Sequence, residues 1–435
     1  MVAARTAVLA GADVTLIEAS DRLGGAVAGA DVGGVRLDTG AESVAARGGA
    51  ALALLRALDL PVVPPAASGA WLQTTRGAFP LPAAGVLGIP GSPLADDVRR
   101  VIGGRASLRA WLDRVLPELS IGRVENLGEL VRRRMGQAVL DELVTPVVAN
   151  VYAVDPMEAE VDSLAPGLNG ALTRTGSLSA AVLALRAAAP AGSAVQGIEG
   201  GMHLLVPALE RDLARFGVPV RMRTPAETLR RIESGWEVAL AGETLTADRV
   251  VLAVAGGTAR ALLAPLLPRA ADDLADWPDA HRTTVVSLVV DAPLLDAAPR
   301  GSGVLVARNV PGVRAGALTH SSAKWPWLAA MLPPSRHAVR LSYRGAAADD
   351  VGEAQALADA AQLLGVAAAD LSVVGSTATQ WRQESQRALI GMRRRIERVR
   401  ESAAELPGLD VTGAWVAGTG LASVIADAER AGRAA

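Results

Sequence analysis

The stretch that decides the fold reads VTLIEASDRLGG and covers residues 14–25. Its first four residues form a short apolar run with β-branched side chains, which predicts a buried strand over residues 14–17. Glu18 stands at the end of that strand, and Gly24 and Gly25 follow after a polar turn. Paired glycines let a backbone approach a ligand closely, so this stretch predicts a strand that ends at a binding turn.

Glu18 has two interpretations. In dinucleotide-binding folds, an acidic residue at such a strand end accepts hydrogen bonds from the adenosine ribose hydroxyls. The alternative is an ordinary solvated carboxylate at a strand end. On the other side, residues 2–9 are rich in alanine and predict a helix, with Gly11 available for its C-cap. A chain that opens with a helix leading into a buried strand is unusual for an α/β fold, because parallel βαβ units begin with a strand.

The rest of the chain predicts a second region between two α/β parts. Residues 66–190 combine proline-rich turns with helical stretches, and residues 283–343 alternate strands and turns, which indicates an antiparallel sheet. The other expected elements are helices at about 104–118, 125–145, 177–189, 204–215 and 393–405, strands at 218–223, 227–232, 236–241, 247–254 and 414–417, and a closing helix.

Composition excludes several classes of function. The chain has no cysteine and only four histidines without paired spacing, which excludes thiolate sites and argues against zinc. The net charge of −2 gives no general attraction to nucleic acid. The mean hydropathy is +0.29, but no apolar run is long enough to predict a spanning helix or a signal peptide. We expect a bacterial cytoplasmic protein, with peripheral membrane contact and oligomeric state left open.

The order of strand, glutamate, arginine and paired glycines resembles the E-x-x-x-R-x-G-G element of the amine oxidase and phytoene desaturase superfamily of FAD enzymes. Residues 38–43, Asp-Thr-Gly-Ala-Glu-Ser, are similar to its next flavin-contacting turn, and residues 413–421 resemble its C-terminal turn and helix start. The resemblance implies FAD as cofactor and these cofactor-binding residues: Glu18, Ala19, Arg22, Gly24, Gly25, Ala26, Gly40, Ala41, Glu42, Ser43, Ala226, Trp381, Thr419, Gly420 and Leu421.

Five further segments resemble the porphyrinogen oxidases, of the protoporphyrinogen and coproporphyrinogen type. They are residues 81–90, 143–156, 200–202, 301–306 and 321–326, and they occur in the family's order. The resemblance implies oxidation of a porphyrinogen in three flavin-mediated steps, with O2 reoxidising the flavin to give peroxide. Coproporphyrinogen III is the favoured substrate and protoporphyrinogen IX the other. The alternatives are an amine or carotenoid oxidoreductase of the superfamily, or a non-catalytic remnant.

The same resemblance implies a Rossmann-like FAD-binding domain assembled from residues 1–65, 195–255 and 375–435. Residues 66–194 and 256–374 would then form a substrate domain of helices and antiparallel sheet. The family's first strand and its G-x-G-x-x-G loop have no counterpart in the chain, which predicts weakened FAD binding.

Departures from the family pattern affect the substrate side. Ala26 stands where a large or basic residue is usual, and Gln386, Ala388 and Met392 replace the proline, tyrosine and histidine of one family segment. Two basic residues are candidate substrate contacts. Arg76 could meet a propionate, or lie in solvent at a hairpin turn. Lys324 could meet a substrate carboxylate or the flavin, although a surface lysine without a partner is the expected alternative.

Overall fold

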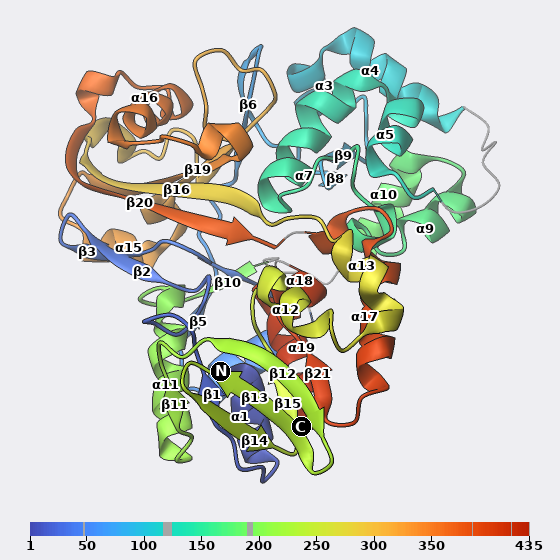
Figure 1. Ribbon diagram of the computed structural model, residues 1–435. Coiled ribbons are helices and arrows are strands. Elements are labelled where there is room, and N and C mark those ends of the chain that lie inside the picture. The colour runs from blue at the N-terminus through green and yellow to red at the C-terminus, as the bar shows by residue number, and fades with distance from the viewer. Residues whose placement is uncertain (47, 116–123, 189–194, 385, 419, 435) are drawn as a thin grey trace.

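The computed structural model describes residues 1–46, 48–115, 124–188, 195–384, 386–418 and 420–434, and it shows two lobes, one above the other (Figure 1). The lower lobe holds both ends of the chain. The upper lobe combines a long antiparallel sheet with a separate group of helices. Helices and strands are mixed throughout, which confirms the predicted α/β class.

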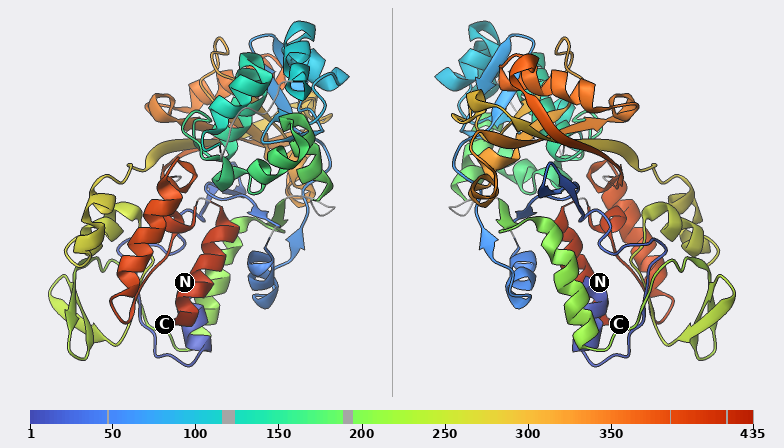
Figure 2. Two further views of the ribbon diagram at one scale, coloured as in Figure 1. Left: turned by 90° about the vertical axis from the view of Figure 1, so that its right-hand side faces the viewer. Right: turned by 90° about the vertical axis from the view of Figure 1, so that its left-hand side faces the viewer.

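Three helices run side by side through the lower lobe (Figure 2): α1 (Val2–Leu9), α11 (Leu205–Arg215) and α19 (Leu421–Ala434). A Cβ on Gly432 would lie 2.4 Å from the carbonyl oxygen of Ala3, so glycine permits the close approach of α19 to α1. The predicted first helix is confirmed. The predicted strand over 14–17 pairs only as β1 (Leu16–Ile17), in parallel with β11 (Val220–Arg221).

The other elements of the lower lobe surround these helices. An antiparallel meander joins β12, β13 and β14, and β15 pairs in parallel with β21. The bounds are β4 (Val44–Ala45), α2 (Ala50–Ala57), β5 (Val62–Val63), β10 (Val195–Ile198), β12 (Ala226–Ile232), β13 (Gly235–Leu240), β14 (Glu243–Ala247), β15 (Val250–Leu252), α12 (Gly256–Leu263), α13 (Ala271–Ala275), α17 (Met392–Ala404), β21 (Leu409–Val411) and α18 (Ala414–Ala417).

The upper sheet has seven strands in the order β20-β16-β19-β18-β17-β6-β7. Its β16, β19 and β20 are long strands paired antiparallel, which confirms the sheet predicted over 283–343. One face packs under α16. The bounds are β6 (Trp71–Thr74), β7 (Gly77–Pro80), β16 (His281–Asp291), β17 (Gly303–Val306), β18 (Ala317–His320), α14 (Ser321–Lys324), α15 (Pro326–Met331), β19 (Arg336–Arg344), α16 (Glu353–Leu364) and β20 (Ser372–Gln383).

The helical part of the upper lobe has its own apolar core, built mainly from Leu, Val and Ile side chains. Its elements are β8 (Gly85–Val86), β9 (Ile89–Pro90), α3 (Asp96–Ile102), α4 (Gly104–Trp111), α5 (Leu127–Met135), α6 (Gln137–Val139), α7 (Thr145–Val151), α8 (Val161–Leu164), α9 (Leu168–Thr175) and α10 (Leu178–Ala187). Among the helices of the described ranges, none combines the length and the apolar character that crossing a membrane requires.

The predicted strand over residues 414–417 is wrong, because this segment is the short helix α18. Gly413 and Gly418 bracket it with φ angles of 111° and 98°, which turn the chain sharply on both sides. The strand position is taken by β21, five residues earlier, which pairs with β15. A short apolar run such as Ala-Trp-Val-Ala fits a buried helical turn as well as a buried strand.

The packing bears on the expected division into domains. Helices α12 and α13, up to Trp277, share an apolar cluster with α17 and α18 of the lower lobe. Strand β20 belongs to the upper sheet along its whole length. We therefore propose that residues 256–277 belong to the expected FAD-binding domain and residues 375–383 to the expected substrate domain.

Candidate flavin site

The turn over residues 38–43 is the junction between the lobes, and Asp38 fixes one side of it. The Asp38 carboxylate accepts hydrogen bonds from the backbone N–H groups of Met202 and His203, both at 2.8 Å, and contacts His203 Nδ1 at 2.7 Å. Both N–H groups lie just before α11, where the start of a helix leaves backbone donors without partners inside the helix, and Asp38 accepts from them. The turn is thus tied to the start of a lower-lobe helix.

Gly40 brings this turn against the paired-glycine loop. The N–H of Ala41 donates to the carbonyl of Ala26 at 2.9 Å, and the N–H of Thr39 donates to the carbonyl of Ala28 at the same distance. A Cβ on Gly40 would lie 1.8 Å from the Ala26 oxygen, which is a backbone atom and cannot move aside easily. Glycine is therefore required at this crossing.

Arg22 and Trp381 lie on the upper side of the same loop. The Trp381 indole Nε1 donates to the Thr39 carbonyl at 2.7 Å, across 342 positions of sequence. The Arg22 guanidinium lies 5.4 Å from the centre of the Trp381 ring and donates to the Gly25 carbonyl at 2.6 Å. A cation over an indole face is attracted by its quadrupole. Through Trp381, strand β20 therefore contacts both the 38–43 turn and the paired-glycine loop.

Glu42 is the centre of a buried charge cluster. Its Oε1 accepts from the indole N–H of Trp325 at 2.7 Å, and its Oε2 lies 3.4 Å from Lys324 Nζ and 3.7 Å from Arg340 Nη1. Arg340 Nη2 also donates to the Gly40 carbonyl at 2.5 Å. Burial alone would raise the pKa of Glu42, but the two cations and the hydrogen bonds outweigh it and lower this pKa.

Glu18 lies where the sequence predicts, directly after β1. Its backbone pairs with the β11 side, through bonds to Arg221 and Thr224, so the following loop runs beside the start of β12 at Ala226. Glu18 Oε1 accepts from the N–H and the hydroxyl of Ser20, each at 2.8 Å, and in the described part of the chain Oε2 has no hydrogen-bond partner, while the N-terminal ammonium of Met1 lies near enough to attract the carboxylate. Ala19 is exposed at this edge.

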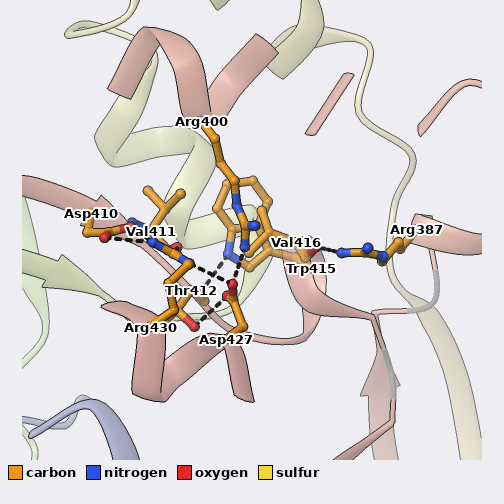
Figure 3. A network of polar contacts seen from close by, with 9 residues as sticks. All are labelled: Arg387, Arg400, Asp410, Val411, Thr412, Trp415, Val416, Asp427 and Arg430. Atoms are coloured by element: carbon orange, nitrogen blue, oxygen red, sulfur yellow. Dashed lines mark hydrogen bonds and ion pairs between the residues drawn. The ribbon is translucent and has the colours of Figure 1, made fainter. Parts of the chain in front are cut away.

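The C-terminal turn is fixed by Asp427 on α19 (Figure 3). Its carboxylate accepts from Arg400 at 2.7 Å, from the Thr412 hydroxyl at 2.8 Å and from Arg430 at 3.1 Å. Arg387 donates to the Val416 carbonyl at 2.9 Å on the other side of the turn. These contacts hold the segment that leads into α19.

The start of α19 lies beside the paired-glycine loop and the 38–43 turn. Leu421 packs in one apolar cluster with Val27 and Ala41, and Met1 belongs to the same cluster. Gly420 is exposed at the helix start. Thr419 lies outside the described residues. Of the predicted segments in the described ranges, the paired-glycine loop, the 38–43 turn, Trp381 and Leu421 therefore lie together, whereas Ala226 packs in a separate apolar cluster with β15 and α12.

The two candidate substrate contacts behave differently. Arg76 is exposed at the β6–β7 hairpin turn and donates to the carbonyl of Val101 at 3.3 Å, so it lies on the helical part of the upper lobe. The expectation of an unpaired surface lysine is wrong for Lys324. Its side chain is 18 % exposed and pairs with Glu42. Sequence reasoning missed this partner because the two residues are 282 positions apart.

The residues present fit the adenosine side of a flavin cofactor, whereas no glycine-rich loop of the pattern G-x-G-x-x-G for its pyrophosphate occurs among the described residues. Gly25 has φ +54°, and an added Cβ would meet no heavy atom within 4 Å, so its outer face is open to a ligand. Glu18 keeps one free carboxylate oxygen for hydroxyl groups. Residues Gly24 to Ala26 are backed by the Gly40 crossing, which holds them rigid. Among the described residues, no group of three or more His, Asp or Glu side chains could hold a metal ion.

Comparison with known proteins gives one consistent result. The profile of the family described as flavin containing amine oxidoreductase matches residues 1–435. The coproporphyrinogen III oxidase of Bacillus subtilis is 26 % identical over 441 residues, covering 95 % of this chain and 89 % of that protein. The coproporphyrinogen III oxidase of Mycobacterium tuberculosis is 31 % identical over 339 residues, covering 74 % and 69 %.

The fold is shared with a solved structure from Exiguobacterium sp. 255-15, whose assignment as a protoporphyrinogen oxidase is provisional. The TM-score is 0.83 at 24 % identity, with 99 % of this chain and 95 % of that chain covered. Together with the arrangement of the Glu18, Gly25, Gly40 and Trp381 segments, the profile match over the whole length shows that the chain belongs to the flavin-containing amine oxidoreductase family.

Proposed function

We propose that this protein is an FAD-dependent oxidase that converts a porphyrinogen into the porphyrin, with O2 as electron acceptor. Coproporphyrinogen III is the proposed substrate and protoporphyrinogen IX the alternative. The observation that carries the proposal is the junction at Gly40, where the paired-glycine loop, the 38–43 turn and Trp381 are bound together. The relatives named above support the choice of a porphyrinogen over an amine.

FAD is the form of the flavin that we propose, because the site offers contacts for an adenosine end. Glu18 would bind the ribose hydroxyls with its free oxygen. The loop from Arg22 to Ala26 would lie along the ligand, and Gly420 and Leu421 would present the first N–H groups of α19 to it. Ala19, Ala226 and Ser43 are further proposed cofactor contacts, through their backbone groups.

When bound, a flavin supplies a two-electron acceptor that can return its electrons to O2. The side chains of this protein orient the reacting groups and set the local field. Glu42 stays ionised because its pKa is lowered, so it offsets part of the charge of Lys324 and Arg340 beside the Gly40 turn. Trp381 of the upper sheet packs against Arg22 of the paired-glycine loop. These contacts join the cofactor turns to the sheet that would carry the substrate.

The proposal is tested with protein loaded with FAD and freed of excess cofactor. Coproporphyrinogen III, protoporphyrinogen IX and a primary diamine are each supplied in air, and porphyrin fluorescence or amine loss is followed. We expect porphyrin to form from coproporphyrinogen faster than in the absence of protein, and no turnover of the amine. Turnover of the amine alone would contradict the proposal.

A further inference from the structure

One row of residues crosses the upper sheet from Trp381, which contacts the 38–43 turn, to the half-buried Arg344. In register, Trp381 of β20 faces Thr283 of β16, and Thr283 faces Arg344 of β19. Residues in one row of a sheet point to the same face, and neighbouring strands are about 4.8 Å apart. The Cα of Arg344 is therefore roughly 10 Å from that of Trp381, whose indole touches the Thr39 carbonyl.

The contacts of Arg340 show that this face of the sheet is directed toward the 38–43 turn. It lies four residues before Arg344 on the same strand, so both side chains leave the same side of the sheet. Its guanidinium reaches the Gly40 carbonyl and the Glu42 carboxylate, which belong to the 38–43 turn. The opposite side of β19 packs its apolar residues against α16. Arg344 thus belongs to the face that looks toward the proposed flavin.

Arg344 is a half-buried cation that no carboxylate neutralises within the described ranges. Its Nη2 donates to the Asn150 carbonyl at 2.7 Å and its Nη1 to the Ala149 carbonyl, both at the end of α7. Its Nε is buried and has no hydrogen-bond partner in the described part of the chain. A guanidinium has five N–H donors, so these contacts leave three. Burial lowers the pKa of Arg344 to about 10.

A strained residue lies close to the same place. Arg344 anchors the end of α7, and Ala153, two residues beyond that helix, adopts φ +57°. This conformation is unfavourable for alanine and persists only where the surroundings impose it. The segment is part of residues 143–156, which resemble the porphyrinogen oxidases in sequence. It meets the sheet at Arg344 and links the helical part of the upper lobe to the row that ends at Trp381.

We propose that Arg344 binds a carboxylate side arm of the substrate and thereby selects a carboxylate-bearing macrocycle. The inference rests on the proposed function and adds the group that fixes the substrate beside the flavin. A carboxylate would supply the missing counter-charge and accept hydrogen bonds from the remaining Nη N–H groups. A cationic amine would meet the positive charges of Arg340 and Arg344 on this face and be repelled.

The test separates charge recognition from structural support. Binding of coproporphyrin III and of its tetramethyl ester to the FAD-loaded protein is measured by fluorescence quenching. The variants are Arg344→Met, Arg344→Lys and the control Arg282→Met. Arg282 adjoins Thr283 on β16, points to the other face and pairs with Asp349.

Arg344→Met should weaken binding of the acid about ten- to hundred-fold and leave binding of the ester within about two-fold. Arg344→Lys, which keeps the charge but loses the planar fork, should weaken binding of the acid less and again spare the ester. Arg282→Met should change neither.

Equal loss of acid and ester binding in both Arg344 variants would show that the arginine only supports α7, and would overturn the inference. Unchanged acid binding by Arg344→Met would also overturn it. If Arg344→Met does not fold, as judged by its circular dichroism, the comparison of acid and ester with Arg344→Lys decides. Failure of the unsubstituted protein to bind either porphyrin would overturn the proposed function itself, and the inference with it.

Discussion

Gly25 gives the sharpest single-residue test of where the cofactor lies. Its φ of +54° is in the left-handed region, and an added Cβ meets no heavy atom within 4 Å. Gly25→Ala should therefore cost the free protein only about 1 kcal/mol, from backbone strain without any clash. In the loaded protein, the same methyl group would occupy the space in which the cofactor approaches the backbone.

The expected loss follows from one disrupted contact. Preventing a close approach removes at least one hydrogen bond to a charged group, worth about 1.5–3 kcal/mol, which corresponds to roughly ten- to hundred-fold in the Kd for FAD. Isothermal titration with FAD measures this loss, and thermal unfolding of the free protein measures the strain separately.

Gly217→Ala is the matched control. Gly217 has φ +71°, an added Cβ there also meets nothing within 4 Å, and it follows α11 at the end away from the Gly25 loop. It should show the same small loss of stability and an unchanged Kd for FAD. Equal FAD affinities for both variants would refute the placement of the cofactor against Gly25.

Three further changes test the junction and the interior. Gly40→Ala should lower the stability of the free protein by about 1–3 kcal/mol or more, because its Cβ would meet the Ala26 oxygen, and an unchanged melting temperature would argue against the crossing. Arg134→Met should cost about 3–5 kcal/mol in urea unfolding, since it leaves the buried Asp113 carboxylate, which keeps its bonds from the backbone N–H groups of Leu178 and Ser179, without its cationic partner; a loss below 1 kcal/mol would contradict this. Burial lowers the pKa of His320 to about 4, so the unfolded chain binds a proton more readily and stability should fall as the pH drops from about 6.5 to 4; His320→Gln should flatten this slope, and an equal slope would assign it to other groups.

The sequence predicted the elements that have a local signal. Alanine-rich residues 2–9 form α1, and the polar turn with paired glycines follows β1 as expected. The apolar run at 414–417 misled, because burial alone does not separate a strand from a helical turn. The helix predicted over 125–145 divides at Gly136, whose φ of 94° ends α5.

Contacts between distant segments had no local signal. Glu42 and Lys324 form their pair across 282 positions, and Arg340 enters the same cluster only because β18 and β19 are neighbours. The sequence marked the turn at 38–43 by its resemblance to a family turn, but the partners of that turn depend on the folded sheet. The same holds for Arg344, whose importance follows from strand register and from burial.

The most direct test of the central claim counts the products of one reaction. FAD-loaded protein is given a limiting amount of coproporphyrinogen III in air, and porphyrin and hydrogen peroxide are quantified together. Loss of six hydrogens in three two-electron steps predicts three peroxide molecules per porphyrin, at a rate above autoxidation. When O2 is absent, porphyrin should form only in the amount that a single reduction of the bound FAD allows. Porphyrin formation no faster than autoxidation for both coproporphyrinogen III and protoporphyrinogen IX would contradict the account.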